Sequence, residues 1–265
     1  MDKGDGFISG FFYLLILYFF LTTRILLASC GSETNGNGPI YQGPPPDLYW
    51  CFANELISEN TIKDVMGSYD GTKNAGVTTG GSGKVDEAVA LDGSTGYITA
   101  APPKANTLTV SVWISPASVS MDHPQIFCQG SGTAGFTGCY LRWDYTERVR
   151  FALYDQEGTL HFVYTSGPIN MGEWTHVVAT VSIVGGNAEI AIFRDGEFQE
   201  SSTFSATSIN YGDNELCLGM NTWGTNRYFD GSIDEFALFI DEVLSDEDIK
   251  ALYDAGAAGQ PIVEH

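Results

Sequence analysis

Between positions 221 and 228 the sequence places aromatic rings among amide and guanidinium groups, a combination that suits sugar recognition. The residues concerned are Asn221, Trp223, Asn226, Arg227 and Tyr228. Sugars stack their C–H faces on aromatic rings while amide and charged groups hydrogen-bond the hydroxyls. We therefore predict that this loop takes part in a carbohydrate site. The alternative is that its aromatic residues only cover the edge of a sandwich.

A second group of the same kind follows a strand-like run in the middle of the chain. Trp143 and Tyr145 flank Asp144 there. We predict these two rings as further ligand contacts, with the same alternative of a purely structural cover.

Four carboxylates have surroundings that would suit calcium. Asp64, Asp70 and Asp92 lie in glycine-rich loops, and Asp234 lies beside a predicted core strand. Ca²⁺ takes about six to eight oxygen ligands, often from loop carboxylates and carbonyls. Calcium is therefore a candidate cofactor. Alternatively, Asp92 makes an Asp-Gly turn and Asp234 is satisfied by backbone N–H groups.

Five cysteines leave an odd thiol if the others pair. Cys128 and Cys139 flank a glycine-rich loop between two strand-like runs, so they could bridge a hairpin. If Cys30 is set aside, Cys51 and Cys217 are left to form a second disulfide. The alternative is that some of these cysteines are buried thiols.

The N-terminal residues have the profile of an export signal. Residues 7–22 form a strongly apolar run, and Leu27–Ala28–Ser29–Cys30 resembles the lipobox of bacterial lipoproteins. That resemblance implies a lipid on Cys30 and anchoring in the cell envelope. An uncleaved membrane anchor, ordinary secretion and a wrongly assigned start codon are the alternatives.

Composition shifts divide the chain into four parts. Residues 1–29 form the signal peptide or anchor, 30–46 a Gly/Pro-rich tether, 47–256 one β-domain and 257–265 a tail. The net charge of −21 with only 12 Lys and Arg argues against nucleic acid as a partner.

The elements that must position these residues are short strands. Alternation is clear in RVRFALYD, where Val149, Phe151 and Leu153 face in while Arg148 and Arg150 face out. About a dozen such runs, separated by Gly- and Asp-rich turns, predict an all-β, two-sheet antiparallel jelly-roll sandwich.

Residues 229–256 predict the closing strand and a short C-terminal helix. Asp234 and Glu235 break the period-2 order, which indicates a bulge or the entry of a strand into a sheet. Ser245 is a helix N-cap candidate, and Gly256 ends the predicted helix. His176 is predicted to be a packed histidine with one hydrogen-bonded nitrogen.

Seven motifs occur in an order that resembles the laminin-G-like jelly rolls of the concanavalin A-like lectin/glucanase superfamily. They are WCF, LDGSTGYI, LTVSVWIS, EWTHVVATV, IFRDG, LCLG and the segment from Phe229 to Tyr253. The resemblance covers about residues 48–253. It implies the same sandwich fold, and it makes a structural or ligand-bridging calcium more plausible.

The resemblance also bears on catalysis. Glucanases of this superfamily carry two catalytic glutamates in an E-x-D-x-x-E strand, but Ser232 and Ala237 occupy those places here. We therefore predict no enzyme activity. The predicted function is an exported, surface-tethered module that binds a glycan or polysaccharide. The alternative is a protein-interaction or structural adhesion domain, and a glycoside hydrolase is a third, weaker alternative.

Overall fold

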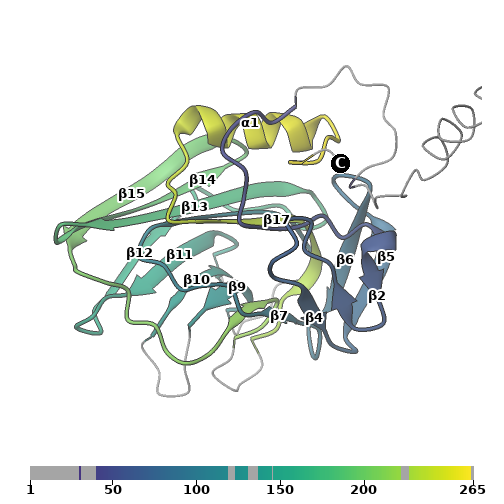
Figure 1. Ribbon diagram of the computed structural model, residues 1–265, viewed down its shortest axis with the longest axis horizontal. Coiled ribbons are helices and arrows are strands. Elements are labelled where there is room, and N and C mark those ends of the chain that lie inside the picture. The colour runs from purple at the N-terminus through teal and green to yellow at the C-terminus, as the bar shows by residue number, and fades with distance from the viewer. Residues whose placement is uncertain are drawn as a thin grey trace, which may run out of the picture.

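The computed structural model describes residues 30, 40–118, 123–130, 137–144, 146–221 and 227–263. Two antiparallel β-sheets lie face to face in this part of the chain, and one helix covers the outer side of one of them (Figure 1). This arrangement confirms the predicted all-β jelly-roll sandwich with a short C-terminal helix.

The first sheet, here called the helix-side sheet, has eight strands in the described residues. In spatial order they are β15 (Glu197–Ser205), β14 (Asn187–Arg194), β13 (Thr175–Val184), β8 (Leu108–Pro116), β17 (Asp230–Ile240), β6 (Glu87–Asp92) and β5 (Val77–Ser82), with β1 (Leu48–Trp50) paired to the end of β17.

The second sheet, here called the open sheet, has nine. In spatial order they are β12 (Leu160–Tyr164), β11 (Val149–Tyr154), β10 (Cys139–Trp143), β9 (Gln125–Gln129), β16 (Leu216–Leu218), β7 (Ile98–Ala100), β4 (Gly71–Lys73), β3 (Thr61–Ile62) and β2 (Ile57–Ser58). A 3₁₀ turn, η1 (Asn54–Leu56), precedes β2.

The closing strand β17 is central, because it pairs with β8, β6 and β1. Its register shifts between Asp234 and Ala237, and Glu235 has a φ of 49°. The break in alternation predicted for this strand is therefore a β-bulge. It turns both carboxylates away from water, since Asp234 and Glu235 are only 0% and 1% exposed.

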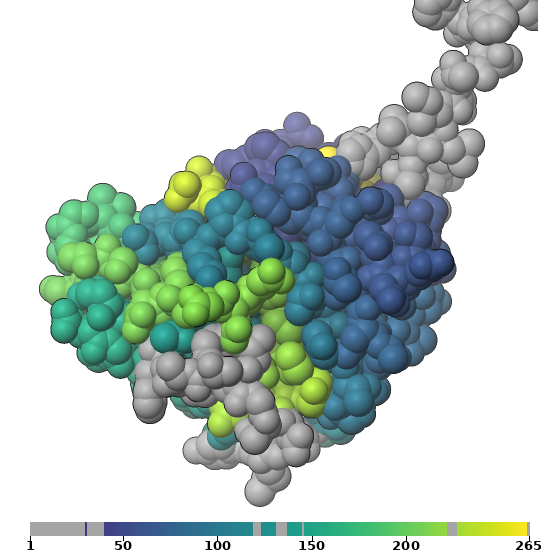
Figure 2. All heavy atoms as spheres, turned by 60° about the horizontal axis from the view of Figure 1, so that its bottom comes forward, coloured from purple at the N-terminus to yellow at the C-terminus, as the bar shows by residue number. Residues whose placement is uncertain are grey.

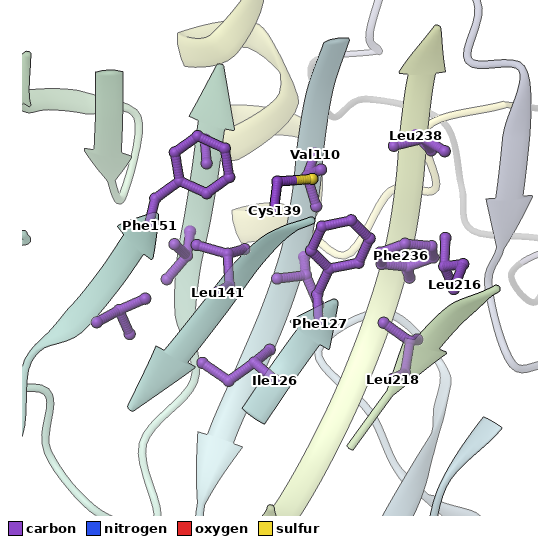
Figure 3. Packing of buried hydrophobic residues seen from close by; sticks show 14 of the residues in the cluster. Val110, Ile126, Phe127, Cys139, Leu141, Phe151, Leu216, Leu218, Phe236 and Leu238 are labelled. Atoms are coloured by element: carbon purple, nitrogen blue, oxygen red, sulfur yellow. The ribbon is translucent and has the colours of Figure 1, made fainter. Parts of the chain in front are cut away.

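Apolar side chains from both sheets fill the space between them (Figure 3). The ring of Phe236 on β17 lies 5.9 Å from Phe127 on β9 and 5.4 Å from Trp50 on β1. Burying a side chain of this size stabilises the fold by about 1.5–3 kcal/mol. Trp143 belongs to this core and is only 1% exposed, because its place on β10 alternates inward. Its prediction as a ligand contact is wrong.

The helix α1 (Asp246–Ala257) seals the outer side of the helix-side sheet. Ser245 caps it as predicted, and its side chain accepts a hydrogen bond from the backbone N–H of Asp248 in a capping box. Gly256, predicted to end the helix, lies inside it. A Cβ there would come within 2.5 Å of Nε1 of Trp113, so this glycine is needed for close packing of the helix on the sheet.

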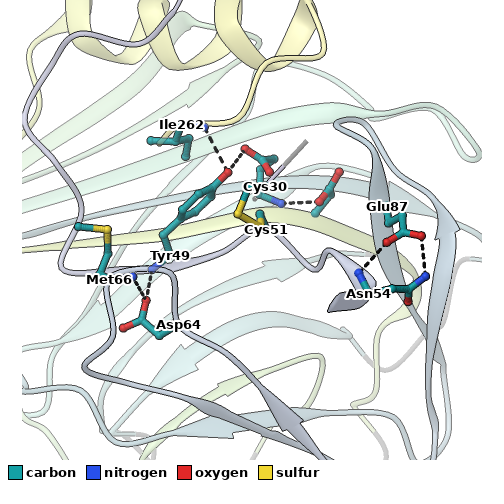
Figure 4. The surroundings of a disulfide bond; sticks show 10 residues. Cys30, Tyr49, Cys51, Asn54, Asp64, Met66, Glu87 and Ile262 are labelled. Carbon is teal, nitrogen blue, oxygen red and sulfur yellow. Dashed lines mark hydrogen bonds between the residues drawn. A yellow bond between two sulfur atoms is a disulfide. The ribbon is translucent and has the colours of Figure 1, made fainter. Parts of the chain in front are cut away.

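The cysteine pairing differs from both predicted disulfides. Cys30 is bonded to Cys51 (Figure 4), and Cys128, Cys139 and Cys217 are buried thiols. The Cys51–Cys217 pairing is wrong because Cys51 already has another partner. Cys128–Cys139 is wrong because Cys128 points to the outer side of its sheet and Cys139 to the core. The prediction of lipid on Cys30 is also corrected, since its sulfur is in the disulfide.

Parts of the predicted tether and tail pack on the domain. Tyr41 and Ile262 are buried in the apolar cluster beneath α1, together with the disulfide. The backbone N–H of Ile262 donates to the hydroxyl of Tyr49 on β1 (Figure 4). In the described residues no helix is long and apolar enough to cross a membrane, and the apolar run 7–22 lies outside them.

Candidate ligand-binding face

The outer side of the open sheet carries the side chains that alternate away from the core. On β11, Val149, Phe151 and Leu153 pack inward, which turns Arg150 and Tyr154 outward. The outward direction of Arg148 and Arg150 follows the sequence prediction. The helix-side sheet has α1 on its outer side, whereas this side of the open sheet has no helix over it in the part of the chain that the structure describes (Figure 1).

Three neighbouring strands place cationic and aromatic side chains together on this side. We call the set the arginine–aromatic face; it consists of Tyr140, Arg142, Arg148, Arg150, Phe162 and Tyr164. The strand register explains the grouping. Arg150 on β11 lies between Arg142 on β10 and Tyr164 on β12. Figure 2 views the molecule from the side on which the open sheet lies.

Guanidinium groups stack on the rings of this face. The guanidinium carbon of Arg150 lies 4.4 Å from the ring centre of Phe162, and that of Arg148 lies 4.3 Å from the ring centre of Tyr164. Arg150 also donates from Nη2 to the hydroxyl of Tyr140 at 3.2 Å. Cation–π contacts of this kind are worth about 0.5–2 kcal/mol each. They hold the rings and the charges in fixed positions.

Phe162 is the ring on this face that is most available to a ligand. It is 46% exposed, although it is a large apolar side chain. Its ring meets that of Tyr164 edge to face at 5.6 Å. An exposed apolar ring beside fixed hydrogen-bond donors provides both a stacking surface and polar contacts for a ligand.

The described end of the 221–228 loop adjoins this face. The carbonyl of Arg227 accepts a hydrogen bond from the backbone of Gln125 on β9 at 3.0 Å. Burial lowers the pKa of His123, and the charges of Arg142 and Arg227 lower this pKa further. Arg227 and Arg142 therefore act on the same histidine.

The remaining predicted ligand contacts divide into two groups. Asn221 is buried and Tyr228 is half-buried at the two described ends of the loop. Trp223, Asn226 and Tyr145 lie outside the described residues and stay predictions. Asp144, from the second predicted group, raises the pKa of His123, whereas Arg227 lowers it. Asp144 and Arg227 therefore both influence the pKa of His123.

Two of the four predicted calcium ligands lie in one loop but are occupied. The carboxylate of Asp64 accepts four backbone N–H groups, including those of Tyr49 and Met66 (Figure 4). Asp70 accepts the backbone N–H of Asp64 at 3.0 Å and the Lys63 ammonium at 2.5 Å. These carboxylates fix the loop by local hydrogen bonds.

The other two predicted calcium ligands are elsewhere and are also hydrogen-bonded. Asp92 accepts the backbone N–H groups of the turn that follows it, from Ser94 to Gly96. Asp234 accepts those of Lys84 and Val85 at 2.8 and 2.9 Å. Among the described residues no group of three His, Cys, Asp or Glu side chains is placed to hold a metal ion. Calcium through these four carboxylates stays a prediction that this arrangement does not favour.

The acidic pair on β17, Asp234 and Glu235, is buried and hydrogen-bonded inside the protein. Glu235 is held by the hydroxyl of Tyr49, which donates to its Oε2 at 2.6 Å. Burial and the neighbouring Asp234 raise the pKa of Glu235. His176 is equally internal. It hydrogen-bonds Ser111 at 2.8 Å through Nε2, as predicted for a packed histidine, and burial lowers its pKa to about 3.

A hollow of about 510 Å³ lies elsewhere, lined by residues of β13, β14 and β15. Glu189 is the charged side chain that lines it, and the lining includes no cation. It therefore lacks the positively charged hydrogen-bond donors that the arginine–aromatic face offers to a ligand.

The arginine–aromatic face, apart from the predicted outward direction of Arg148 and Arg150, is not evident from the sequence. Four of its residues come from two short runs: Tyr140 and Arg142 from CYLRW, and Phe162 and Tyr164 from LHFVY. In both runs, residues that face away from the core alternate with residues that pack in it. The sequence shows this alternation, but it does not show the order in which the strands pair, and that order brings the residues together.

Comparisons with known proteins agree with this architecture. The model of a family described as the concanavalin A-like lectin/glucanases superfamily matches residues 92–250. No curated protein matches the sequence.

Three solved structures show how far the likeness extends. Domain 4 of an extracellular GH43 arabinanase from Geobacillus stearothermophilus, in complex with arabinotriose, is 18% identical, with a TM-score of 0.61 over 80% of this chain and 100% of that one. The ligand-binding domain of botulinum neurotoxin serotype D, in complex with N-acetylneuraminic acid, is 17% identical, with a TM-score of 0.61 over 79% and 50%. The binding domain of Paraclostridial mosquitocidal protein 1 is 14% identical, with a TM-score of 0.60 over 79% and 52%. This chain thus spans about half the length of the two toxin domains.

Proposed function

The chain belongs to the concanavalin A-like lectin/glucanases superfamily, and we propose that it is an exported, non-catalytic module that binds carbohydrate. The ligand lies on the arginine–aromatic face. The observation that carries this proposal is the exposed ring of Phe162, fixed beside Tyr164 and two stacked guanidinium groups.

Two similar structures support carbohydrate as the ligand class. The arabinanase domain holds arabinotriose and the neurotoxin domain holds N-acetylneuraminic acid. Because one fold serves many functions, these sugars do not transfer to this chain by likeness. They make a sugar a reasonable occupant for a face that already has the required chemistry.

The surroundings of β17 support a non-catalytic role. Ser232 and Ala237 stand where the resemblance would require catalytic glutamates. The two carboxylates between them, Asp234 and Glu235, are buried and hydrogen-bonded within the protein. A retaining glucanase needs two carboxylates about 5–5.5 Å apart on either side of the scissile bond, and a buried pair cannot reach one.

Export is supported by two observations. The apolar run 7–22 followed by small residues is typical of a secretory signal. The Cys30–Cys51 bond is of a type that persists in oxidising compartments.

The test is a polysaccharide pull-down with folded wild-type protein and a Phe162→Ala/Tyr164→Ala variant. We expect wild-type protein to bind at least one polysaccharide in a broad panel and the variant to lose about tenfold or more in affinity. Phe198→Ala is the matched control, because Phe198 is 52% exposed but lies on β15 of the other sheet.

Equal binding by the double variant and the wild type would show that the arginine–aromatic face is not the binding site. No binding by folded wild-type protein, together with specific capture of a protein partner, would favour the adhesion alternative.

A further inference from the structure

Positive charge is concentrated on one small part of an acidic protein. The net charge is −21, with 33 Asp and Glu against 12 Lys and Arg. Four of the six arginines nevertheless meet at one end of the open sheet: Arg142, Arg148 and Arg150 on the arginine–aromatic face, and Arg227 beside it. In a chain with so few cations, this grouping needs a physical explanation.

The two central arginines repel each other in the protein alone. Arg142 and Arg150 lie directly opposite in the β10–β11 register, and like charges in that position are destabilising. Burial and the charge of Arg150 lower the pKa of Arg142. The fold therefore keeps two like charges opposite each other on the outer side of the open sheet.

No carboxylate in the described residues forms a close ion pair with Arg142 or Arg150. The close cation–carboxylate pairs in that part of the chain involve other cations, namely Lys63, His161, Arg194 and Lys250. The buried Nε atoms of Arg142 and Arg150 have no hydrogen-bond partner there. Arg150 is only 7% exposed, and a charge so deeply buried ordinarily has an ionic partner.

Two carboxylates around these strands, those of Asp144 and Glu200, accept hydrogen bonds from other donors. Asp144 accepts hydrogen bonds from the backbone and the hydroxyl of Thr146. Glu200 accepts the backbone N–H of Tyr164 at 2.6 Å. Arg142 is half-buried, so its guanidinium is the one of the pair that stays partly accessible to an anion from outside the described protein.

We propose that the carbohydrate bound on the arginine–aromatic face is acidic, with sugar carboxylates received by Arg142 and Arg150. This inference rests on the proposed function. Arginine forms paired, planar hydrogen bonds with a carboxylate, and Phe162 supplies a ring on which the same sugar unit stacks.

The net charge of the protein favours a sugar acid over a heavily sulfated polymer as the ligand. A polymer with a dense negative charge meets the repulsion of a −21 protein along its length. A sugar acid with one carboxylate per unit brings a charge to the arginines with less repulsion elsewhere. The attraction between the arginines and a carboxylate is local, because salt screens exposed charges beyond one Debye length, about 8–10 Å.

The experiment compares polygalacturonate with its fully methyl-esterified form, which keeps the backbone but neutralises the carboxylates. We expect wild-type protein to bind polygalacturonate about tenfold or more tightly than the ester. The Arg142→Met/Arg150→Met variant, which keeps the apolar stems, should lose that preference. Arg194→Met on β14 of the other sheet is the charge-matched control and should keep the preference.

The possible results distinguish the inference of an acidic ligand from the proposed function on which it rests. Equal or tighter binding to the ester overturns the acidic ligand. A preference that survives in the folded arginine variant overturns the assignment of the carboxylate to Arg142 and Arg150. Both results leave carbohydrate binding intact. Tighter binding to dextran sulfate than to polygalacturonate overturns the choice of carboxylate. Binding to no polysaccharide in the wider panel overturns the proposed function itself.

Folding of the arginine variants is checked by their unfolding midpoint. If the double variant does not fold, the single variant Arg142→Met replaces it, because Arg142 is half-buried whereas Arg150 is buried. Loss of preference for polygalacturonate in that variant supports the inference, and full retention counts against it.

Discussion

The two outer faces of the sandwich have opposite physical characters. Over the helix-side sheet, α1 buries Ile249 and Leu252 on the strands beneath it, and the Cys30–Cys51 bond lies in the same apolar cluster. Over the open sheet, the arginine–aromatic face leaves Phe162 exposed and two guanidinium groups without carboxylates from the described residues.

This difference indicates that one face stabilises the fold and the other binds a ligand. The sealed face resembles a second core, in which apolar burial and a covalent bond stabilise the fold. The open face retains features that cost stability, such as the like-charged pair of Arg142 and Arg150. Costly features of that kind are expected where a ligand is bound.

The largest expected effect lies on the sealed face. Ile249→Ala should lower the free energy of unfolding by about 2–5 kcal/mol, because a fully buried side chain leaves a cavity under α1. Urea unfolding measures the change, and polysaccharide affinity should stay at the wild-type value. Val243→Ala, at a 41% exposed position near the helix, should change stability by about 0.5 kcal/mol or less. A weakened affinity in folded Ile249→Ala would mean that the two faces are not independent.

A slightly smaller effect is expected at the disulfide. Cys51→Ser should cost about 3 kcal/mol, because the bond closes a loop between positions 21 residues apart. Reductant should lower the unfolding free energy of the wild type to that of the variant. Peptide mapping should recover the Cys30–Cys51 link. A lipid on Cys30, or a link from Cys51 to Cys217, would contradict the structure of the sealed face.

The smallest expected effect concerns calcium. The carboxylates of Asp64, Asp70, Asp92 and Asp234 already accept hydrogen bonds from the protein, so Ca²⁺ should give no measurable rise in Tm and a chelator no fall. A ligand that binds only the native state raises Tm. A clear rise with Ca²⁺ would restore the predicted calcium site.

Local pattern was enough to predict much of the fold. Alternation predicted the inward and outward residues of β11, and Ser245 predicted the helix start, because both signals are carried by neighbouring residues. The broken period at Asp234 and Glu235 predicted the bulge for the same reason.

Pairings between distant segments were not predictable in that way. Trp143 was misassigned because an isolated Trp-Asp-Tyr sequence does not show which face of β10 is the core. The cysteine pairing failed because spacing alone does not place Cys30 beside Cys51. The arginine–aromatic face needed the β10–β11–β12 register, which joins residues from three separate runs.

The most direct test is an NMR titration of the folded protein with galacturonate oligosaccharides. We predict that the shifted signals map to β10, β11 and β12, including the Nε–H groups of Arg142 and Arg150, while α1 and β15 stay unchanged. Shifts confined to α1 and β15, or none on the open sheet under conditions in which the polysaccharide binds, would contradict the assignment of the arginine–aromatic face as the binding site.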